Sequence, residues 1–165
     1  MDRLILLRHG KAEPESASGE DFDRRLASRG VQESARMAES LADLGFRPDV
    51  ALVSPAARTR DTWAAVEPAF PGTKVSFGDD LYHAGSEEVR RCAEAAGAKA
   101  ATVLVVGHNP GLQELTVRLL IEGHAPASLI AKAQSRFPTA AAAVFLFDDH
   151  GRPAYDGLFF PERGG

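Results

Sequence analysis

Short apolar runs alternate along the chain with segments in which apolar residues recur at helical spacing. Buried strands are predicted by the runs at 4–7, 50–53, 74–77 and 102–106, and a helical pattern follows each of them. Two further runs, 143–147 and 155–160, flank the turn residues 148–153 and predict a C-terminal hairpin. The pattern therefore predicts an α/β fold, a three-layer sandwich with a mostly parallel open sheet and helices on both faces.

Residues with known positional preferences mark where the helices begin and end. Gly45 is placed to end the first helix, and Ser86, followed by two acidic residues, predicts a capped start for the third. Asn109 at the N-cap and Pro110 at the first helical position predict the start of the fourth. Cys92 falls on the apolar face of the third helix, where its spacing favours a core residue over a nucleophile.

Composition and charge narrow the classes of protein. The chain has 165 residues, 44% of them hydrophobic and 25% charged, which predicts one soluble domain over residues 1–165. The net charge of −4 argues against a nucleic-acid binder, although a local arginine cluster could bind a small or protein-borne phosphate. The single cysteine excludes an internal disulfide. No apolar run is long enough for a signal peptide or a membrane span, so a cytoplasmic protein without membrane contact is predicted.

Three motifs follow three of the predicted strands. Arg8-His9-Gly10 follows the first, the segment Ser54 to Thr59 follows the second, and Gly107 to Gly111 follows the fourth. The carboxyl ends of parallel strands lie at one edge of a sheet, where ligands bind in such folds. We therefore expect Arg8, His9, Arg58 and His108 to converge at that edge, although 99 positions separate the two histidines.

Such a set of side chains suits a phosphoryl group. Arginine is always charged and can bind two oxygens at once, so Arg8 and Arg58 are predicted to clamp a phosphate. The backbone amides that open the helix at Asn109 add oriented donors, and Gly10 lets the backbone approach a ligand. Two neighbouring guanidinium groups should lower the pKa of His9 and keep the ring neutral and nucleophilic at pH 7.

Each motif alone also fits an ordinary structural role. An Arg-His-Gly sequence after a strand is often a solvated turn, and His108 could simply donate a hydrogen bond to a carbonyl. A metal site on the two histidines would need a third ligand, and the sequence offers none at ligand spacing. The three motifs on one edge together favour a phosphate site without a metal.

The same motifs resemble those of a known family. Leu4 to Ala12, Ser54 to Thr62 and Val106 to Gly111 are similar to the histidine phosphatase superfamily, also called phosphoglycerate-mutase-like. The segment from Asp21 to Gly30 resembles a further motif of its compact branch, D-x-x-R-P-L-T-x-x-G, with arginine at 25 in place of proline and alanine at 27 in place of threonine. Size and motif order most resemble the SixA-type phosphohistidine phosphatases.

The resemblance implies a mechanism and site residues. His9 would be the nucleophile that carries a transient phosphohistidine, and Arg8, Arg58 and His108 would stabilise the charge on the phosphoryl oxygens. No metal or organic cofactor is implied. Larger members supply a carboxylate as general acid after the third strand, and Asp80 is the position here that aligns with it.

The assignment of Asp80 has alternatives. Asp79 and Asp80 also have the preferences of ordinary turn residues, and His83 could reach the site instead. A phosphate ester needs an acid to protonate its leaving alkoxide, whereas a phosphoramidate leaves more easily once its nitrogen is protonated. A compact site with a poor acid therefore suits a protein-borne phosphohistidine.

We therefore expect a metal-independent phosphatase that acts on phosphohistidine in a protein, for example in a phosphohistidine-bearing signalling domain. The alternatives are the same chemistry on a small phosphorylated substrate, such as a sugar phosphate or nucleotide, and a phosphate-binding module without turnover. The complete set Arg8, His9, Arg58 and His108 argues against the module.

Overall fold

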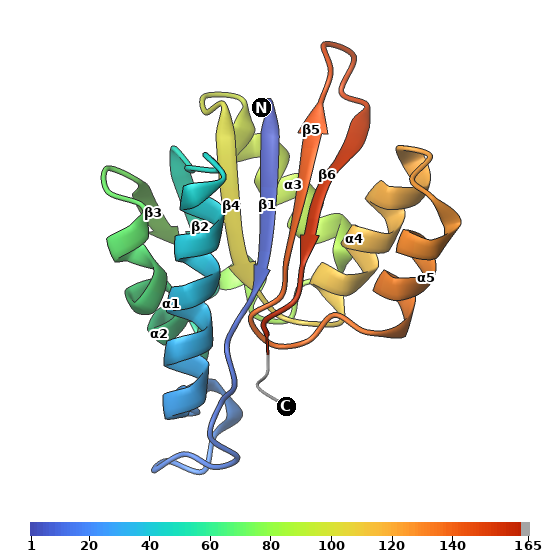
Figure 1. Ribbon diagram of the computed structural model, residues 1–165. Helices are drawn as coiled ribbons and strands as arrows, with labels where there is room; N and C mark the ends of the chain where they lie inside the picture. The colour runs from blue at the N-terminus through green and yellow to red at the C-terminus, as the bar shows by residue number, and fades with distance from the viewer. Residues whose placement is uncertain (163–165) are drawn as a thin grey trace.

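The computed structural model describes residues 1–162, which form a six-stranded sheet with helices on both faces (Figure 1). The strands are β1 (Arg3–Arg8), β2 (Val50–Val53), β3 (Lys74–Phe77), β4 (Thr102–Gly107), β5 (Ala142–Phe147) and β6 (Pro153–Phe159). Their order is β3-β2-β4-β1-β5-β6. The first four along this order pair in parallel, and β5 and β6 form an antiparallel hairpin at the edge. The predicted α/β fold with its C-terminal hairpin is confirmed.

The helices divide between the two faces of the sheet. They are α1 (Ser28–Asp43), α2 (Ala57–Val66), α3 (Ser86–Gly97), α4 (Gly111–Glu122) and α5 (Ala127–Ser135), with short 3-10 turns η1 (Asp21–Asp23), η2 (Glu67–Ala69) and η3 (Asp79–Leu81). α1 and α2 pack on one face, and α3, α4 and α5 pack on the other (Figure 1). The helix α5 was not predicted from the hydrophobic pattern.

The strand β1 explains the unbroken apolar run at the start of the chain. Its four apolar residues are fully buried and alternate between faces, with Ile5 and Leu7 in the core under α1 and α2 and Leu4 and Leu6 in the core on the opposite face. A central parallel strand covered on both sides requires such a run. Because β1 lies between β4 and β5, its end is held on both sides, and the residues that follow it are placed rigidly.

Two predicted helix starts differ in detail. Gly85, not Ser86, is the N-cap of α3, and Ser86 is its buried first residue. α4 begins at Gly111, with Pro110 as its N-cap, and the Asn109 side chain donates from Nδ2 to the Phe137 carbonyl at 2.9 Å. Gly45 does follow the end of α1, with φ +85°, a conformation that favours glycine.

Cys92 lies half-buried on α3 against the neighbouring apolar core. Burial, and then the charge of Glu88, raise the pKa of its thiol, which disfavours the reactive thiolate. Within the described part of the chain, no helix combines the length and apolar character needed to cross a membrane.

Candidate active site

The three motifs meet in one pocket at the carboxyl edge of the parallel strands. β1 and β4 pair so that Arg8 lies opposite Gly107, which places His9 beside His108, with ring centroids 5.3 Å apart. The pocket is lined by Arg8, His9, Lys11, Ala12, Arg24, Arg58, His108, Asn109 and Thr139. Arg8, His9, Arg58, His108 and Asn109, all proposed for the site from the sequence, therefore lie on its wall, whereas Gly10, Asp80 and the alternative acid His83 do not.

The His9 ring is fixed in one orientation. Its Nδ1 lies 2.7 Å from the carbonyl oxygen of Gly10. Because a carbonyl can only accept, Nδ1 carries the proton and donates it, which leaves the lone pair on Nε2. Burial, and then the charges of Arg8 and Arg58, lower the pKa of His9 to about 4 against the raising effect of that hydrogen bond. At neutral pH His9 is an uncharged imidazole whose Nε2 carries no proton.

Gly10 follows His9 in the chain and is not among the residues that line the pocket. Its amide donates to the Thr62 hydroxyl at 3.1 Å, and Thr62 in turn donates to the Arg58 carbonyl at 2.8 Å. The turn after β1 is thereby tied to the first turns of α2. This link gives the turn that carries His9 and the start of α2, which carries Arg58, a common support.

His108 is oriented by the second motif. Its Nε2 lies 2.7 Å from the hydroxyl of Ser54, a fully buried residue at the end of β2. Burial, and then the nearby His9 and Arg58, lower the pKa of His108 to about 3. Both histidines are therefore neutral at pH 7, and the positive charge in the pocket comes from arginine and lysine.

The arginines are held by backbone and side-chain oxygens. Arg8 Nη1 donates to the Phe137 carbonyl at 3.1 Å, from the segment that leads into β5. Arg58 donates from Nη1 to the Asp21 carbonyl at 2.9 Å and from Nη2 to the Asp21 carboxylate at 3.1 Å. An arginine with fixed orientation can meet phosphoryl oxygens without first reorganising.

The segment between β1 and α1 adds residues to the site for which the sequence analysis proposed no role. Arg24 lines the pocket, and it donates from Nε to the Glu13 carbonyl at 2.8 Å and from Nη1 to the Asp21 carboxylate at 2.9 Å. Arg25, which replaces the proline of the family motif, binds both carboxylate oxygens of Asp61 on α2 at 2.7 and 2.8 Å. The family motif matched by residues 21–30 is the feature of the sequence that could have identified Asp21 and Arg24 as site residues.

Asp80 is not brought to this pocket. It lies in η3 and lines a separate hollow with Cys92, Ala95 and Leu52 among others. The neighbouring Leu81 turns into the core beside α3 and α4, and Asp80 acts electrostatically on Cys92. The geometry therefore gives no support to Asp80 as the general acid.

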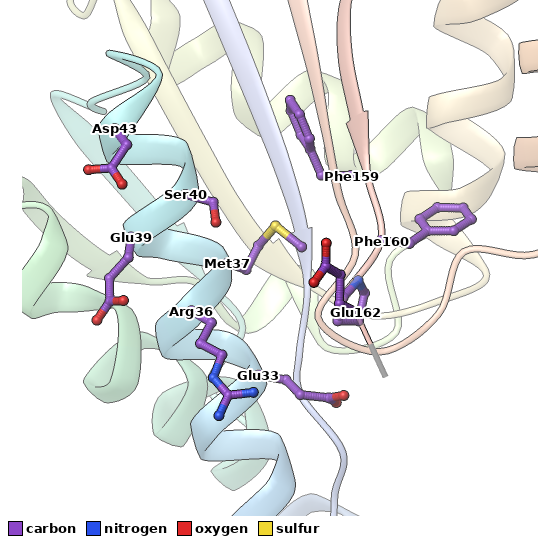
Figure 2. Close-up of a pocket in the computed structure, with 10 residues that line it drawn as sticks. Glu33, Arg36, Met37, Glu39, Ser40, Asp43, Phe159, Phe160 and Glu162 are labelled. Carbon is purple, nitrogen blue, oxygen red and sulfur yellow. The ribbon is translucent and has the colours of Figure 1, made fainter. Parts of the chain in front are cut away.

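A larger hollow lies elsewhere, between α1 and the end of β6 (Figure 2). It is lined by Glu33, Arg36, Met37, Glu39, Ser40, Asp43, Phe159, Phe160, Pro161 and Glu162. No histidine, cysteine or pair of arginines lies among these residues, so the hollow lacks the groups that phosphoryl transfer needs. Across residues 1–162 there is also no cluster of three or more His, Cys, Asp or Glu side chains placed to hold a metal ion.

Comparisons with known proteins agree with this geometry. The family model of the histidine phosphatase superfamily (branch 1) matches residues 4–82. An uncharacterized Mycobacterium tuberculosis protein is 30% identical over 145 residues, which cover 87% of this chain and 89% of that protein. An uncharacterized chloroplastic protein of Arabidopsis thaliana is 28% identical over 152 residues, 86% of this chain, and the match spans only 65% of that longer relative.

Among solved structures, one from Agrobacterium tumefaciens superposes with a TM-score of 0.83 at 34% sequence identity. The alignment covers 97% of this chain and 98% of that one, and the Agrobacterium protein is assigned as a phosphohistidine phosphatase SixA. The likeness therefore extends over the whole described fold, including the hairpin β5–β6 that the family model does not reach.

Proposed function

Because the chain belongs to the histidine phosphatase superfamily, in its SixA-type branch, we propose that it hydrolyses phosphohistidine in a protein substrate through a phosphorylated His9. The observation that carries this proposal is the state of His9: a buried neutral ring, with Nδ1 held by the Gly10 carbonyl and Nε2 left for attack, in a pocket lined by three arginines.

The proposed reaction has two displacements at phosphorus. In the first, Nε2 of His9 forms a bond to phosphorus while the bond to the leaving nitrogen breaks. The leaving imidazole is protonated beforehand on its other ring nitrogen, so the leaving nitrogen keeps the electron pair and the ring departs neutral. In the second, water attacks the phosphoryl group on His9, releases inorganic phosphate and restores the neutral ring. Arg8, Arg58 and His108 would stabilise the charge on the phosphoryl oxygens in both steps, and losing one such donor costs about 100- to 1000-fold in rate.

The carboxylates around the pocket support a phosphoramidate substrate. Asp21 is the carboxylate in contact with Arg58, but the Tyr82 hydroxyl and the neighbouring arginines hold the pKa of Asp21 well below its usual range. An ionised Asp21 cannot give a proton to a leaving group, and Asp80 lines a different hollow. A phosphoester would thus depart without Asp21 or Asp80 as its acid, whereas an imidazole leaving group can take its proton before the bond breaks.

A panel of substrates tests this preference. We expect kcat/KM for a phosphohistidine peptide or phosphoramidate to exceed that for alkyl phosphate monoesters, such as sugar phosphates and nucleotides, by at least about 100-fold, the usual value of general acid catalysis. Equal or better turnover of a sugar phosphate or nucleotide would instead identify a phosphomonoesterase. Tight phosphate binding with no turnover of any substrate would identify a binding module.

The protonation state of His9 gives a second, independent prediction. Its pKa is lowered to about 4, so the ring should stay neutral as the pH falls from 7 to 5, whereas an unperturbed histidine becomes charged near 6.5. NMR titration of the ring resonances, with His9→Ala and His108→Ala spectra for assignment, checks this. A His9 midpoint at 6 or above would contradict the proposed neutral nucleophile at low pH.

A further inference from the structure

We propose that Tyr82 and Asp21 are positioning residues for Arg58, and that they fix the phosphate-binding face of its guanidinium before substrate arrives. The proposal rests on the proposed function, since it concerns how that pocket is held ready. Its structural basis is a set of hydrogen bonds that joins η1, η3 and the start of α2.

The hydrogen bonds of Arg58 leave some N–H groups of its guanidinium available to bind a phosphate. The two bonds to Asp21, one to the carbonyl and one to the carboxylate, use one N–H on each terminal nitrogen. A guanidinium has five N–H donors in one plane, so fixing two of them fixes the direction of the rest. The side chain is only 10% exposed, and it lines the pocket beside His9 and His108.

Asp21 needs a support of its own to act in this way. It lies in η1, a three-residue turn with no buried residue, and its side chain is 50% exposed. Figure 1 shows this segment extending away from the sheet between β1 and α1. A carboxylate on such a segment is not held by core packing, so its position depends on its polar contacts.

Tyr82, directly after η3, supplies that support. Its hydroxyl donates to Asp21 Oδ2 at 2.6 Å, the same oxygen that accepts from Arg58 Nη2. The ring is itself fixed, with Phe22 at 4.9 Å in an edge contact, His83 at 4.0 Å and His108 at 5.7 Å between centroids. The Arg58 guanidinium carbon lies 5.9 Å from the centre of the same ring.

The chemical value of this arrangement is preorganisation. A guanidinium already turned toward the phosphoryl oxygens loses little freedom when it binds them, and the benefit is kept in the transition state. Hydrogen bonds to an ionised carboxylate are among the stronger ones in proteins, so this network can hold Arg58 where a neutral pair could not. Tyr82 would thus act on the reaction through Arg58 and not on the substrate.

The test is Tyr82→Phe, which removes the hydroxyl and keeps the ring contacts. We expect a fall of about 10-fold in kcat/KM for a phosphoramidate, the usual effect of losing one hydrogen bond to a charged group. Inhibition by tungstate, a tetrahedral oxyanion, should weaken by a similar factor. Tyr155→Phe is the matched control, because Tyr155 is the only other tyrosine of the chain and lies on β6, and it should keep wild-type values.

A double-mutant cycle with Arg58→Ala separates positioning from a general structural role. If Tyr82 acts through Arg58, adding Tyr82→Phe to Arg58→Ala should change kcat/KM by less than about 2-fold. A full 10-fold loss in that background, or wild-type kinetics for Tyr82→Phe alone, would overturn the proposal. The Asp21→Asn variant gives a second cycle with the same expectation, should one of the other variants fold poorly.

The proposal and the proposed function can fail separately. If the wild-type protein hydrolyses no phosphorylated substrate, the proposed function fails, and calorimetric tungstate binding still compares Tyr82→Phe with the wild type. Affinity weakened about 10-fold by Tyr82→Phe, and unchanged by it in the Arg58→Ala background, would then support the positioning role. Equal affinities of the wild type and Tyr82→Phe would refute it.

Discussion

Replacing His9 with alanine should lower kcat/KM by about 10,000-fold or more, the size of effect seen when a catalytic nucleophile is removed. His9 lines the arginine-rich pocket, and its Nε2 keeps a lone pair because Nδ1 donates to the Gly10 carbonyl. An alanine side chain has no atom that can accept the phosphoryl group. The measurement is steady-state turnover of a phosphoramidate, together with mass spectrometry of the denatured protein. The quench should be alkaline, because a phosphohistidine hydrolyses in acid.

Two controls make this result specific. His150→Ala, at an exposed turn position in the β5–β6 hairpin, should leave turnover unchanged. His108→Ala should slow the reaction but still form a phosphoprotein on His9, because His108 is proposed to stabilise charge and not to form a bond. A His9→Ala protein that keeps more than about a tenth of wild-type turnover would refute the proposed mechanism.

The convergence of the motifs was predictable because it follows from topology alone. Each of the three turns comes directly after a parallel strand, so strand order does not have to be known to place Arg8, Arg58 and His108 at one edge. The buried run of β1 was equally readable, since a strand covered on both faces leaves no polar position. The order of strands and turns along the chain and the burial pattern of a strand were therefore enough to predict the parts of the site that regular elements build.

The part that sequence reasoning missed is built by irregular segments. Asp21 meets Arg58 across 37 positions and Tyr82 across 61, through loops with no apolar periodicity to fix their course. Asp80 was assigned by its place after β3, but Leu81, the next residue, is the one the core takes up, and this leaves Asp80 at another hollow. In such segments a shift of one residue redirects a side chain, and only tertiary contacts decide it.

Those irregular segments depend on close backbone packing, and this leads to the second large effect. Gly30 lies in the first turn of α1, where an added Cβ would be 2.2 Å from the Lys11 carbonyl oxygen and 2.7 Å from the Lys11 amide. Gly10 is packed in the same way, with an added Cβ 2.5 Å from the Gly30 carbonyl oxygen. The turn that carries His9 therefore rests directly on the backbone of α1.

We expect Gly30→Ala to lower the free energy of unfolding by about 3 kcal/mol and to reduce kcat/KM as well. In a helix interior, replacing glycine with alanine normally raises the stability of the protein by about 1 kcal/mol. A loss of stability in Gly30→Ala would therefore come from the contact with Lys11 and not from helix propensity. Gly85→Ala is the matched control: Gly85 is the N-cap of α3, has φ −79°, and has nothing within 4 Å of an added Cβ, so its cost should stay below about 1 kcal/mol.

Urea unfolding and steady-state kinetics on both variants decide the matter. A Gly30→Ala protein as stable and active as the wild type would mean that Lys11 can move away from α1 without displacing His9, and that the nucleophile turn is positioned by β1 and Thr62 alone.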